Sequence, residues 1–438
     1  MTTEPAGESG LGEAKTRERF SPAYRRYVLA LLFVAYVFNF VDRQILSILL
    51  EPIKRDLGAS DTMMGFLTGI AFALFYTVMG IPIARLADRG VRRSVMAAGI
   101  AVWSAMTAIS GLARTPWQLA AARIGVGVGE AALSPPAHSL LSDYFPPARR
   151  ATALSIYSMG IHVGIMFGFV TGGWINELFG WREAFFVVGL PGLVVALLVR
   201  FTVREPQRGA SEANRDTSDA PSVGEVLRFL WALRSFRHFA LAGALTSFAG
   251  YGLTMWGPAF LIRVHGMSTG EAGTWLGVLT GVFGAAGAFA GGTLSDRLGV
   301  GDKRWYLWLP AIAAGVALPF GAAFLLVPHA ETALLLFTPA LFVGAMWLGP
   351  VFSLTQTMAR LRMRSVSAAI LFFVINLIGL GLGPQVVGVL NDTLFADLGA
   401  ESVRASLLLV IVAMNLWALV HFVLATRTLR DDLQRREG

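Results

Sequence analysis

Twelve long apolar segments run through this 438-residue chain, and their length constrains the fold more than any other feature. A helix needs about 20 apolar residues to cross the hydrocarbon core of a bilayer. The segments lie at residues 27–50, 62–85, 94–113, 116–141, 150–178, 183–203, 236–262, 270–294, 305–327, 331–359, 365–391 and 403–426. This pattern predicts an all-α integral membrane protein with twelve transmembrane helices.

The composition supports a membrane protein and argues against other classes. Hydrophobic residues make up 55% of the chain and charged residues only 15%, too few for the charged outer faces of soluble helices. The net charge of +8 could indicate a nucleic-acid partner, but Lys and Arg stand in short clusters between the apolar segments. The chain has no Cys, which excludes disulfides, a thiol nucleophile and a Cys-based metal site.

The distribution of Lys and Arg predicts the orientation in the membrane. When alternate connections are assigned to opposite sides, 28 of these residues fall on the side that holds both termini and six on the other. Positive residues concentrate in cytoplasmic loops. Both termini are therefore predicted to be cytoplasmic.

The most polar stretch between segments, residues 204–222, divides them six and six, so that a domain boundary is expected there. Helical spacing of apolar residues after it predicts a helix at the membrane surface. The start of the chain lacks the apolar core of a signal peptide. The predicted parts are a disordered cytoplasmic tail (1–20), a six-helix bundle (21–203), a linker with a surface helix (204–235), a second six-helix bundle (236–427) and a cytoplasmic tail (428–438).

A short turn motif occurs once in each half of the chain. Its two copies, at residues 84–90 and 292–299, each end a long apolar segment, and their Asp-Arg pairs are 208 positions apart. A charged turn at matching points predicts a duplicated bundle whose halves move against each other. We expect Asp88, Arg89, Asp296 and Arg297 to act as a conformational latch. Neighbouring arginines such as Arg92 are expected to anchor in the lipid headgroups.

Glycines recur at every fourth position in the fifth segment, at residues 160, 164, 168 and 172. This spacing makes a smooth stripe along one helix face and predicts that another helix packs closely against it.

Four charged residues lie well away from the ends of the apolar segments: Asp42, Arg43, Arg123 and Glu130. A charge in the middle of a lipid-facing helix costs about 3 kcal/mol or more, so these side chains must face the protein interior. Arg123 and Glu130, seven residues apart, share a helix face. One interpretation is a neutral network that only cross-links two helices. The other is a coupling site, in which a protonatable Asp42 or Glu130 exchanges an arginine with the anionic head of a substrate.

Several motifs resemble the Spinster branch of the major facilitator superfamily. They are Val37–Arg43, Phe72–Pro82, Arg123–Ala131, Pro135–Phe145 and Tyr251–Trp256, and the repeated turn resembles the loop signature of the superfamily, with Ala84 where the family has Gly. The resemblance implies two pseudo-symmetric six-helix bundles in a bacterial inner membrane. It also implies proton-coupled transport, by alternating access, of amphipathic anionic lipids such as lysophospholipid or sphingosine-1-phosphate-like molecules. The four membrane charges are then the central site, and the glycine stripe resembles that of exporters and antiporters.

An amphipathic substrate also needs an apolar wall. Apart from Arg237 and Arg404 at segment ends, the last six segments contain no Lys or Arg, so the head is expected in the first half and the tail in the second. The candidates for substrate contact besides Arg43 and Arg123 are Tyr36, Asn39, Tyr76, Phe248, Tyr251, Met255, Trp256, Phe372 and Asn376. His138 is expected to bond near a helix end, and His162 either lines the cavity or packs.

Other functions remain as alternatives. The same fold could move small organic anions or amphipathic drugs. A membrane enzyme is disfavoured because the chain has no His-Glu-x-x-His motif and no Gly-x-Ser-x-Gly elbow. A channel or scramblase would not need a protonatable network. We expect no cofactor and no metal, a proton gradient as energy source, no nucleic-acid partner and a monomer.

Overall fold

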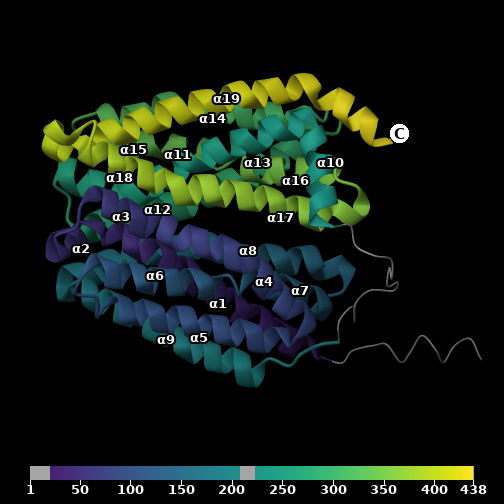
Figure 1. Ribbon diagram of the computed structural model, residues 1–438, viewed down its shortest axis with the longest axis horizontal. Coiled ribbons are helices and arrows are strands. Elements are labelled where there is room, and N and C mark those ends of the chain that lie inside the picture. The colour runs from purple at the N-terminus through teal and green to yellow at the C-terminus, as the bar shows by residue number, and fades with distance from the viewer. Residues whose placement is uncertain (1–19, 208–221, 438) are drawn as a thin grey trace, which may run out of the picture.

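The computed structural model describes residues 20–207 and 222–437, and all regular elements in these ranges are helices. They run along the long axis of the molecule in two groups, drawn in purple to blue and in teal to yellow in Figure 1. We refer to them as the first group and the second group.

The first group precedes residue 208. Its helices are α1 (Pro22–Ile48), α2 (Leu50–Leu57), α3 (Asp61–Thr68), α4 (Ile70–Arg89), α5 (Arg92–Ser110), α6 (Pro116–Glu130), α7 (Ser134–Tyr144), α8 (Pro147–Phe179) and α9 (Trp181–Thr202).

The second group follows residue 221. Its helices are α10 (Val223–Ala232), α11 (Arg234–His265), α12 (Thr269–Leu279), η2 (Thr280–Gly284), α13 (Ala285–Leu298), α14 (Trp305–Leu326), α15 (Ala330–Gly344), α16 (Leu348–Met358), η3 (Leu361–Met363), α17 (Arg364–Ile375), η4 (Asn376–Leu382), α18 (Gly383–Asp392), η5 (Ala396–Glu401) and α19 (Ser402–Glu437).

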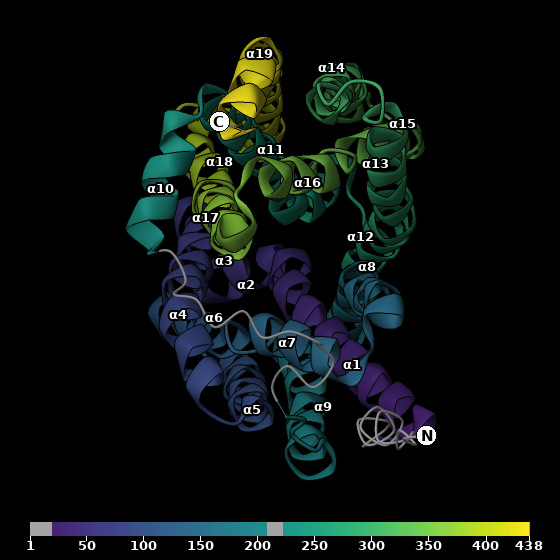
Figure 2. The ribbon, with the colours of Figure 1, turned by 90° about the vertical axis from the view of Figure 1, so that its right-hand side faces the viewer.

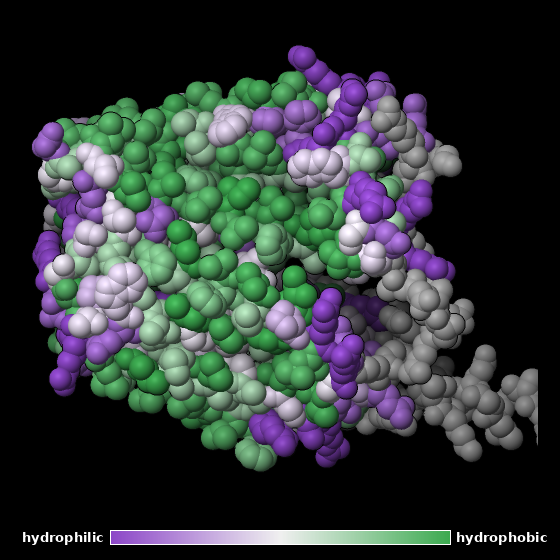
Figure 3. Space-filling model, in the orientation of Figure 1, coloured by the Kyte–Doolittle hydropathy of each residue, from purple (hydrophilic) through white to green (hydrophobic). Residues whose placement is uncertain are grey.

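The helices are built to cross a membrane. In the described ranges, nine helical segments are long and apolar enough to span one. Hydrophobic residues cover the middle of the surface in Figure 3, and hydrophilic residues gather at its two ends. The predicted segment 116–141 is split into α6 and α7, each too short to span alone. The all-α membrane fold is confirmed, whereas the count of twelve spans stays a prediction.

The predicted division of the chain also stays a prediction. The predicted tail at residues 1–20 lies outside the described residues except for Phe20, as do residues 208–221 of the linker. After the linker, the predicted surface helix is present as α10, which buries Val226 and Leu230 and exposes Leu227 and Trp231. The predicted tail at 428–438 is helical as far as Glu437, because α19 continues through it.

The glycine stripe on α8 packs against α1, as predicted. A Cβ atom at Gly164 would lie 2.6 Å from the carbonyl oxygen of Val37, and one at Gly168 would lie 2.9 Å from that of Val41. Only glycine allows the two backbones to approach this closely. The contact holds α1, which carries Asp42 and Arg43, firmly within the first group.

The two groups are in contact mainly at the end of the molecule that lies opposite the chain termini. We call the end where α1 begins and α19 ends the terminal end, on the right in Figure 1 and facing the viewer in Figure 2, and the opposite end the far end. The most extensive contacts between the groups join α8 to α12, α3 to α18 and α4 to η4, and α1 also contacts α11. Between the groups at the terminal end, the surface in Figure 3 is hollowed.

The repeated turns lie at the terminal end, where α4 ends at Arg89 and α13 ends at Leu298. The expectation that Arg92 anchors in lipid headgroups was wrong. Arg92 is buried, and its guanidinium binds Asp143 at 2.6 Å and Glu205 at 2.7 Å. This arginine therefore fastens the chain that leaves α9 to the end of the first group.

Candidate functional site

A cavity of about 330 Å³ lies between the two groups. The first group lines it with residues from α1, α3, α4, α6 and α8, and the second group with residues from α11, α12, α14, α15 and α19, among others. Arg43, Arg123 and His162 are the ionisable side chains of its wall apart from tyrosine, and all three come from the first group. The cavity therefore has one charged side and one neutral side.

The first ion pair of the charged side joins α1 to α6. Arg43 donates from Nε to Oε2 of Glu130 at 2.6 Å, and both side chains are buried. Glu130 is the last residue of α6, just before the turn that leads to α7. A break in a membrane helix is tolerated where it lines a cavity or is enclosed by protein. The break places this carboxylate at the bend of the interrupted helix.

The second ion pair lies beside the first. Arg123 donates from Nη1 to Oδ1 of Asp42 at 3.2 Å, and each side chain is only 2% exposed. Thr107 on α5 also donates a hydrogen bond to Asp42. The structure thus brings together the four membrane charges singled out in the sequence, as two pairs that each join α1 to α6.

Aromatic rings surround the two guanidinium groups. The Arg43 guanidinium lies 4.8 Å from the ring centre of Phe40, 5.1 Å from that of Phe72 and 4.5 Å from that of Tyr76. Arg123 lies 5.4 Å from the Phe72 ring. Cation–π contacts of this kind stabilise a cation with little surrounding water. The rings hold the positive charges in place without neutralising them.

Several buried polar atoms of the site have unused bonding capacity, and two of them belong to its ion pairs. Within the described structure, Oε1 of Glu130 and Nε of Arg123 are buried and have no hydrogen-bond partner. Buried polar atoms are nearly always paired, so each such exception needs an explanation. One oxygen that can accept a proton and one guanidinium N–H that can bind an anion are the groups that a coupled site needs.

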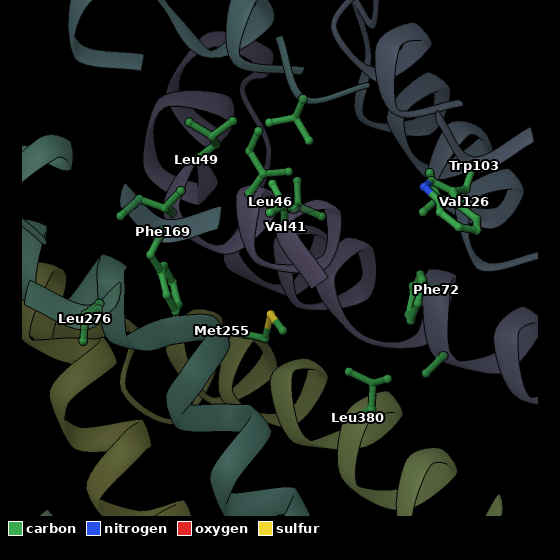
Figure 4. Packing of buried hydrophobic residues seen from close by; sticks show 14 of the residues in the cluster. Val41, Leu46, Leu49, Phe72, Trp103, Val126, Phe169, Met255, Leu276 and Leu380 are labelled. Atoms are coloured by element: carbon green, nitrogen blue, oxygen red, sulfur yellow. The ribbon is translucent and has the colours of Figure 1, made fainter. Parts of the chain in front are cut away.

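The neutral side of the cavity is mainly apolar. Tyr251 and Met255, both predicted from the sequence, line it, and the small polar residues Ser247 and Asn415 lie among apolar side chains. Figure 4 shows Met255 between the side chains Phe169 of the first group and Leu380 of the second. This wall can take an apolar chain.

Other predicted wall residues lie elsewhere. Trp256 packs inside the second group instead of facing the cavity: it is fully buried and donates from Nε1 to the carbonyl of Pro384 at 2.8 Å. Its neighbour Met255 lines the cavity, whereas the Trp256 side chain is directed toward Pro384 on α18. Phe248 is buried in the core, and Asn376 bonds the carbonyl of Phe372 at 2.8 Å.

The remaining predicted contacts belong to the first group. Tyr36 and Asn39 precede Arg43 on α1, and Tyr76 on α4 lies beside the Arg43 side chain. Tyr36 stacks on Tyr157 with ring centres 4.3 Å apart, Asn39 is 1% exposed, and Tyr76 covers the Arg43 guanidinium. His162, left open between two roles, lines the cavity.

The predicted latch residues lie at the terminal end of the molecule. Asp296 accepts a hydrogen bond from Tyr306 at 2.8 Å, within the second group. Asp88, Arg89 and Arg297 are exposed at the terminal end. The latch stays a prediction at this end.

Sequence reasoning missed Phe72, Thr107 and Asn415. Thr107 is one of many neutral residues in an apolar segment, and only its contact with Asp42 marks it. A search of the described residues for three or more His, Cys, Asp or Glu side chains that could hold a metal ion finds none.

Comparison with known proteins identifies the family. The model of the Major Facilitator Superfamily matches residues 32–384. The chain belongs to this superfamily. Its members are transporters, so the protein is a membrane transporter and not an enzyme.

The relatives also confirm the resemblance to Spinster proteins. A crystal structure of a bacterial homologue of the human lysosomal transporter Spinster, inward-facing and unoccupied, superposes with a TM-score of 0.86 and 32% identity over 94% of this chain and 99% of that one. An MFS-type efflux pump of Mycolicibacterium smegmatis is 35% identical over 95% of this chain and 96% of its own length. A probable L-galactonate transporter of Escherichia coli is 26% identical over 78% of this chain and 75% of its own length.

Proposed function

We propose that this superfamily member is a proton-coupled exporter of amphipathic anions, such as lysophospholipids or sphingosine-1-phosphate-like molecules, that works by alternating access. The observation that carries the proposal is the division of the cavity. Two arginines, each paired with a carboxylate, stand on one side, and an uncharged, mainly apolar wall stands on the other. A molecule with an anionic head and an apolar tail matches both sides.

Coupling follows from competition for the arginines. An anionic head that binds Arg43 draws it away from Glu130, and a buried carboxylate without its cation favours the protonated form. Proton binding to Glu130 in turn frees Arg43 for substrate. Arg123 and Asp42 form a second pair of the same kind. The unpaired Oε1 of Glu130 supports this role, since it is the atom that would receive the proton.

The terminal end is the cytoplasmic side in this proposal. It carries the loops rich in Lys and Arg, as expected for the cytoplasmic face of a bacterial inner membrane. The hollow between the groups lies at this end, and the similar solved structure is inward-facing. Substrate would then enter from the cytoplasm or from the inner leaflet, and protons would enter from the far side.

Flux in proteoliposomes with imposed pH gradients of both signs tests the proposal. The panel holds a lysophospholipid, a sphingoid phosphate, a sugar acid and an amphipathic drug. We expect lipid flux to reverse when the gradient is reversed. The Glu130→Gln variant is expected to fold, with a lowered melting temperature, and to bind substrate, but to lose at least about 100-fold of the gradient-driven flux, because its amide cannot take up a proton.

The matched control is Glu331→Gln, which neutralises an exposed carboxylate and should leave flux unchanged. Full gradient-driven flux in Glu130→Gln would remove this residue from the coupling mechanism.

A second candidate is a proton-coupled transporter of small organic anions or amphipathic drugs. The likeness to an efflux pump and to a probable L-galactonate transporter favours it. The same charged wall would bind a carboxylate, and the neutral wall would then contribute little. Driven flux of the sugar acid or the drug, without lipid flux, would select this alternative.

A further inference from the structure

A buried ion cluster joins the two groups at the far end. Arg263 near the end of α11 donates to both carboxylate oxygens of Asp61 on α3, at 2.5 Å and 2.8 Å. Its Nε donates to Glu51 on α2 at 2.6 Å, and Lys54 lies 2.5 Å from Asp61. The side chains of Glu51, Asp61 and Arg263 are at most 9% exposed. A bidentate pair of this kind is among the stronger charge-assisted contacts in proteins.

The second group also caps a helix of the first. Asp392, the last residue of α18, accepts hydrogen bonds from the backbone N–H groups of Asp61 at 3.3 Å and Thr62 at 2.6 Å. Asn391 donates to Asp61 at 2.9 Å. The first N–H groups of a helix have no partner within it, and a carboxylate near them is stabilising. If the groups separated here, α3 would lose this cap.

The backbones in this region are in direct contact. A Cβ atom at Gly65 of α3 would lie 2.7 Å from the carbonyl oxygen of Pro384, and one at Gly388 of α18 would clash with the carbonyl oxygen of Asp61. Small residues are needed where helices approach this closely. We call this line of contact between the two groups the seam, and it leaves no room for a substrate.

The seam extends from the ion cluster to the edge of the cavity. Ser47 on α1 donates to the backbone carbonyls of Thr254 at 2.9 Å and Met255 at 3.0 Å on α11, and Met255 lines the cavity. Arg43, Ser47 and Glu51 are spaced four residues apart, so they follow one face of α1 and α2 from the charged site to the cluster. The contact between the groups is therefore continuous from the cavity to the far end.

We infer that the cluster of Glu51, Asp61, Arg263 and Asp392 is the latch that keeps the cavity closed at the far end. This inference rests on the alternating access of the proposed function and does not depend on which substrate is moved. Removing one partner of a buried ion pair leaves an uncompensated charge, which destabilises the form that buries it. In the form that is open at the far end, water reaches these groups, so removing one partner destabilises that form only slightly. Weakening the latch must therefore shift the protein toward the far-end-open form.

Distances between spin labels in nanodiscs test this inference. The chain contains no Cys, so labels can be placed at will. One pair, Leu112→Cys with Leu398→Cys, reports on the far end, and another, Val91→Cys with Val300→Cys, reports on the terminal end; all four positions are exposed. Without substrate, Arg263→Ala should raise the ratio of far-end-open to far-end-closed molecules at least about tenfold. The terminal-end distance should shorten in the same molecules.

The matched control is Arg182→Ala. Arg182 pairs with Asp56 at 2.7 Å, a contact within the first group near the start of α9, so this variant should keep the wild-type distances. If Arg263→Ala does not fold, Asp392→Asn and Arg263→Lys weaken the same cluster more gently and should shift the ratio in the same direction. Wild-type distances in the folded variants would overturn the latch. Because the measurement needs no substrate, absence of lipid flux would count against the proposed function and leave this result standing.

Discussion

The two groups of helices differ in what they bury beside the cavity. The first buries two ion pairs, Arg43 with Glu130 and Arg123 with Asp42. The second group contributes Ser247, Asn415 and a mainly apolar wall. The ion pairs beside the cavity are therefore confined to one half of a pseudo-symmetric molecule. This half can bind the polar head of a substrate, while the other half accepts its apolar part.

The backbones of the two groups resemble each other more than their side chains do. The segment with α3 and α4 is interrupted at Gly69, and the segment with α12 and α13 is interrupted by the π-helix η2. Likewise α6 and α7 are separated by a turn, as are α15 and α16. Interruptions of this kind occur frequently at functional sites. The helix interruptions occur in both halves, whereas the buried charges occur in one. The two halves therefore share the positions at which their helices can bend, but not the residues that would bind a substrate.

The largest expected effect comes from breaking the first ion pair. Arg43→Gln leaves Glu130 as a buried, unpaired carboxylate, which costs about 3–5 kcal/mol when a buried pair loses one partner. We expect flux to fall at least about 100-fold and the melting temperature to drop. The double variant Arg43→Gln with Glu130→Gln should regain most of the stability, since no charge is left unpaired, but none of the flux. Scanning fluorimetry and proteoliposome flux measure the two effects separately.

The control for this prediction lies in the second group. Asn415 lines the cavity and donates to the carbonyl of Ile411 in its own helix. Asn415→Leu should change flux less than about threefold. If instead Arg43→Gln transports like the wild type, the charges of the first group are structural.

The charged site could be predicted because charges are rare in apolar segments. Asp42, Arg43, Arg123 and Glu130 stand out in the sequence for this reason alone. Their pairing could not be predicted, because two arginines and two carboxylates at similar depth allow either combination. The uncharged residue Thr107 carries no such signal.

The far-end cluster could not be predicted at all. Asp61 and Arg263 stand at the ends of apolar segments, where charges are ordinary, and 202 positions separate them in the chain. For the residues of the neutral wall, in contrast, the sequence offered more candidates than line the cavity. Of the candidates on the seventh segment, Tyr251 and Met255 line the cavity, but an aromatic residue such as Trp256 serves the core as readily as a binding site.

An intermediate effect is expected from shortening the neutral side of the cavity. Gly344 lines the cavity, and no heavy atom lies within 4 Å of the position its Cβ would take. The Cβ of Gly344→Leu therefore meets no neighbouring atom, and the side chain occupies space that a lipid tail would use. Displacing two or three methylene groups at about 0.8 kcal/mol each amounts to about 2 kcal/mol, a loss of roughly 30-fold in affinity.

The loss should appear for lysolipids with 16 to 18 carbons and not for those with eight, measured by binding to the purified protein. Gly315→Leu is the control, since Gly315 also has open space at its Cβ but lies on the outer surface of α14. Equal losses for long and short chains would mean that the tail does not bind the second group.

The smallest effect is expected at the terminal end, where the groups anchor their loops differently. The first group buries Arg92 between Asp143 and Glu205, whereas the second holds a partly exposed Asp302 against Arg304 and Arg430, at 2.8 Å and 3.0 Å. The hydrogen bonds from Arg304 keep the pKa of Asp302 well below its ordinary value.

A carboxylate with a depressed pKa stabilises the folded state above its unfolded pKa of about 3.9, and this contribution fades as the pH falls below that value. For an exposed pair it amounts to a few tenths of a kcal/mol. Asp302→Asn should therefore lower the melting temperature by about 1 °C or less between pH 8 and pH 5, and the difference should shrink below pH 4. Thermal unfolding in detergent across this range measures it. A difference that grows as the pH falls would show that Asp302 is not held in its charged form, and that the second group anchors its loop by other contacts.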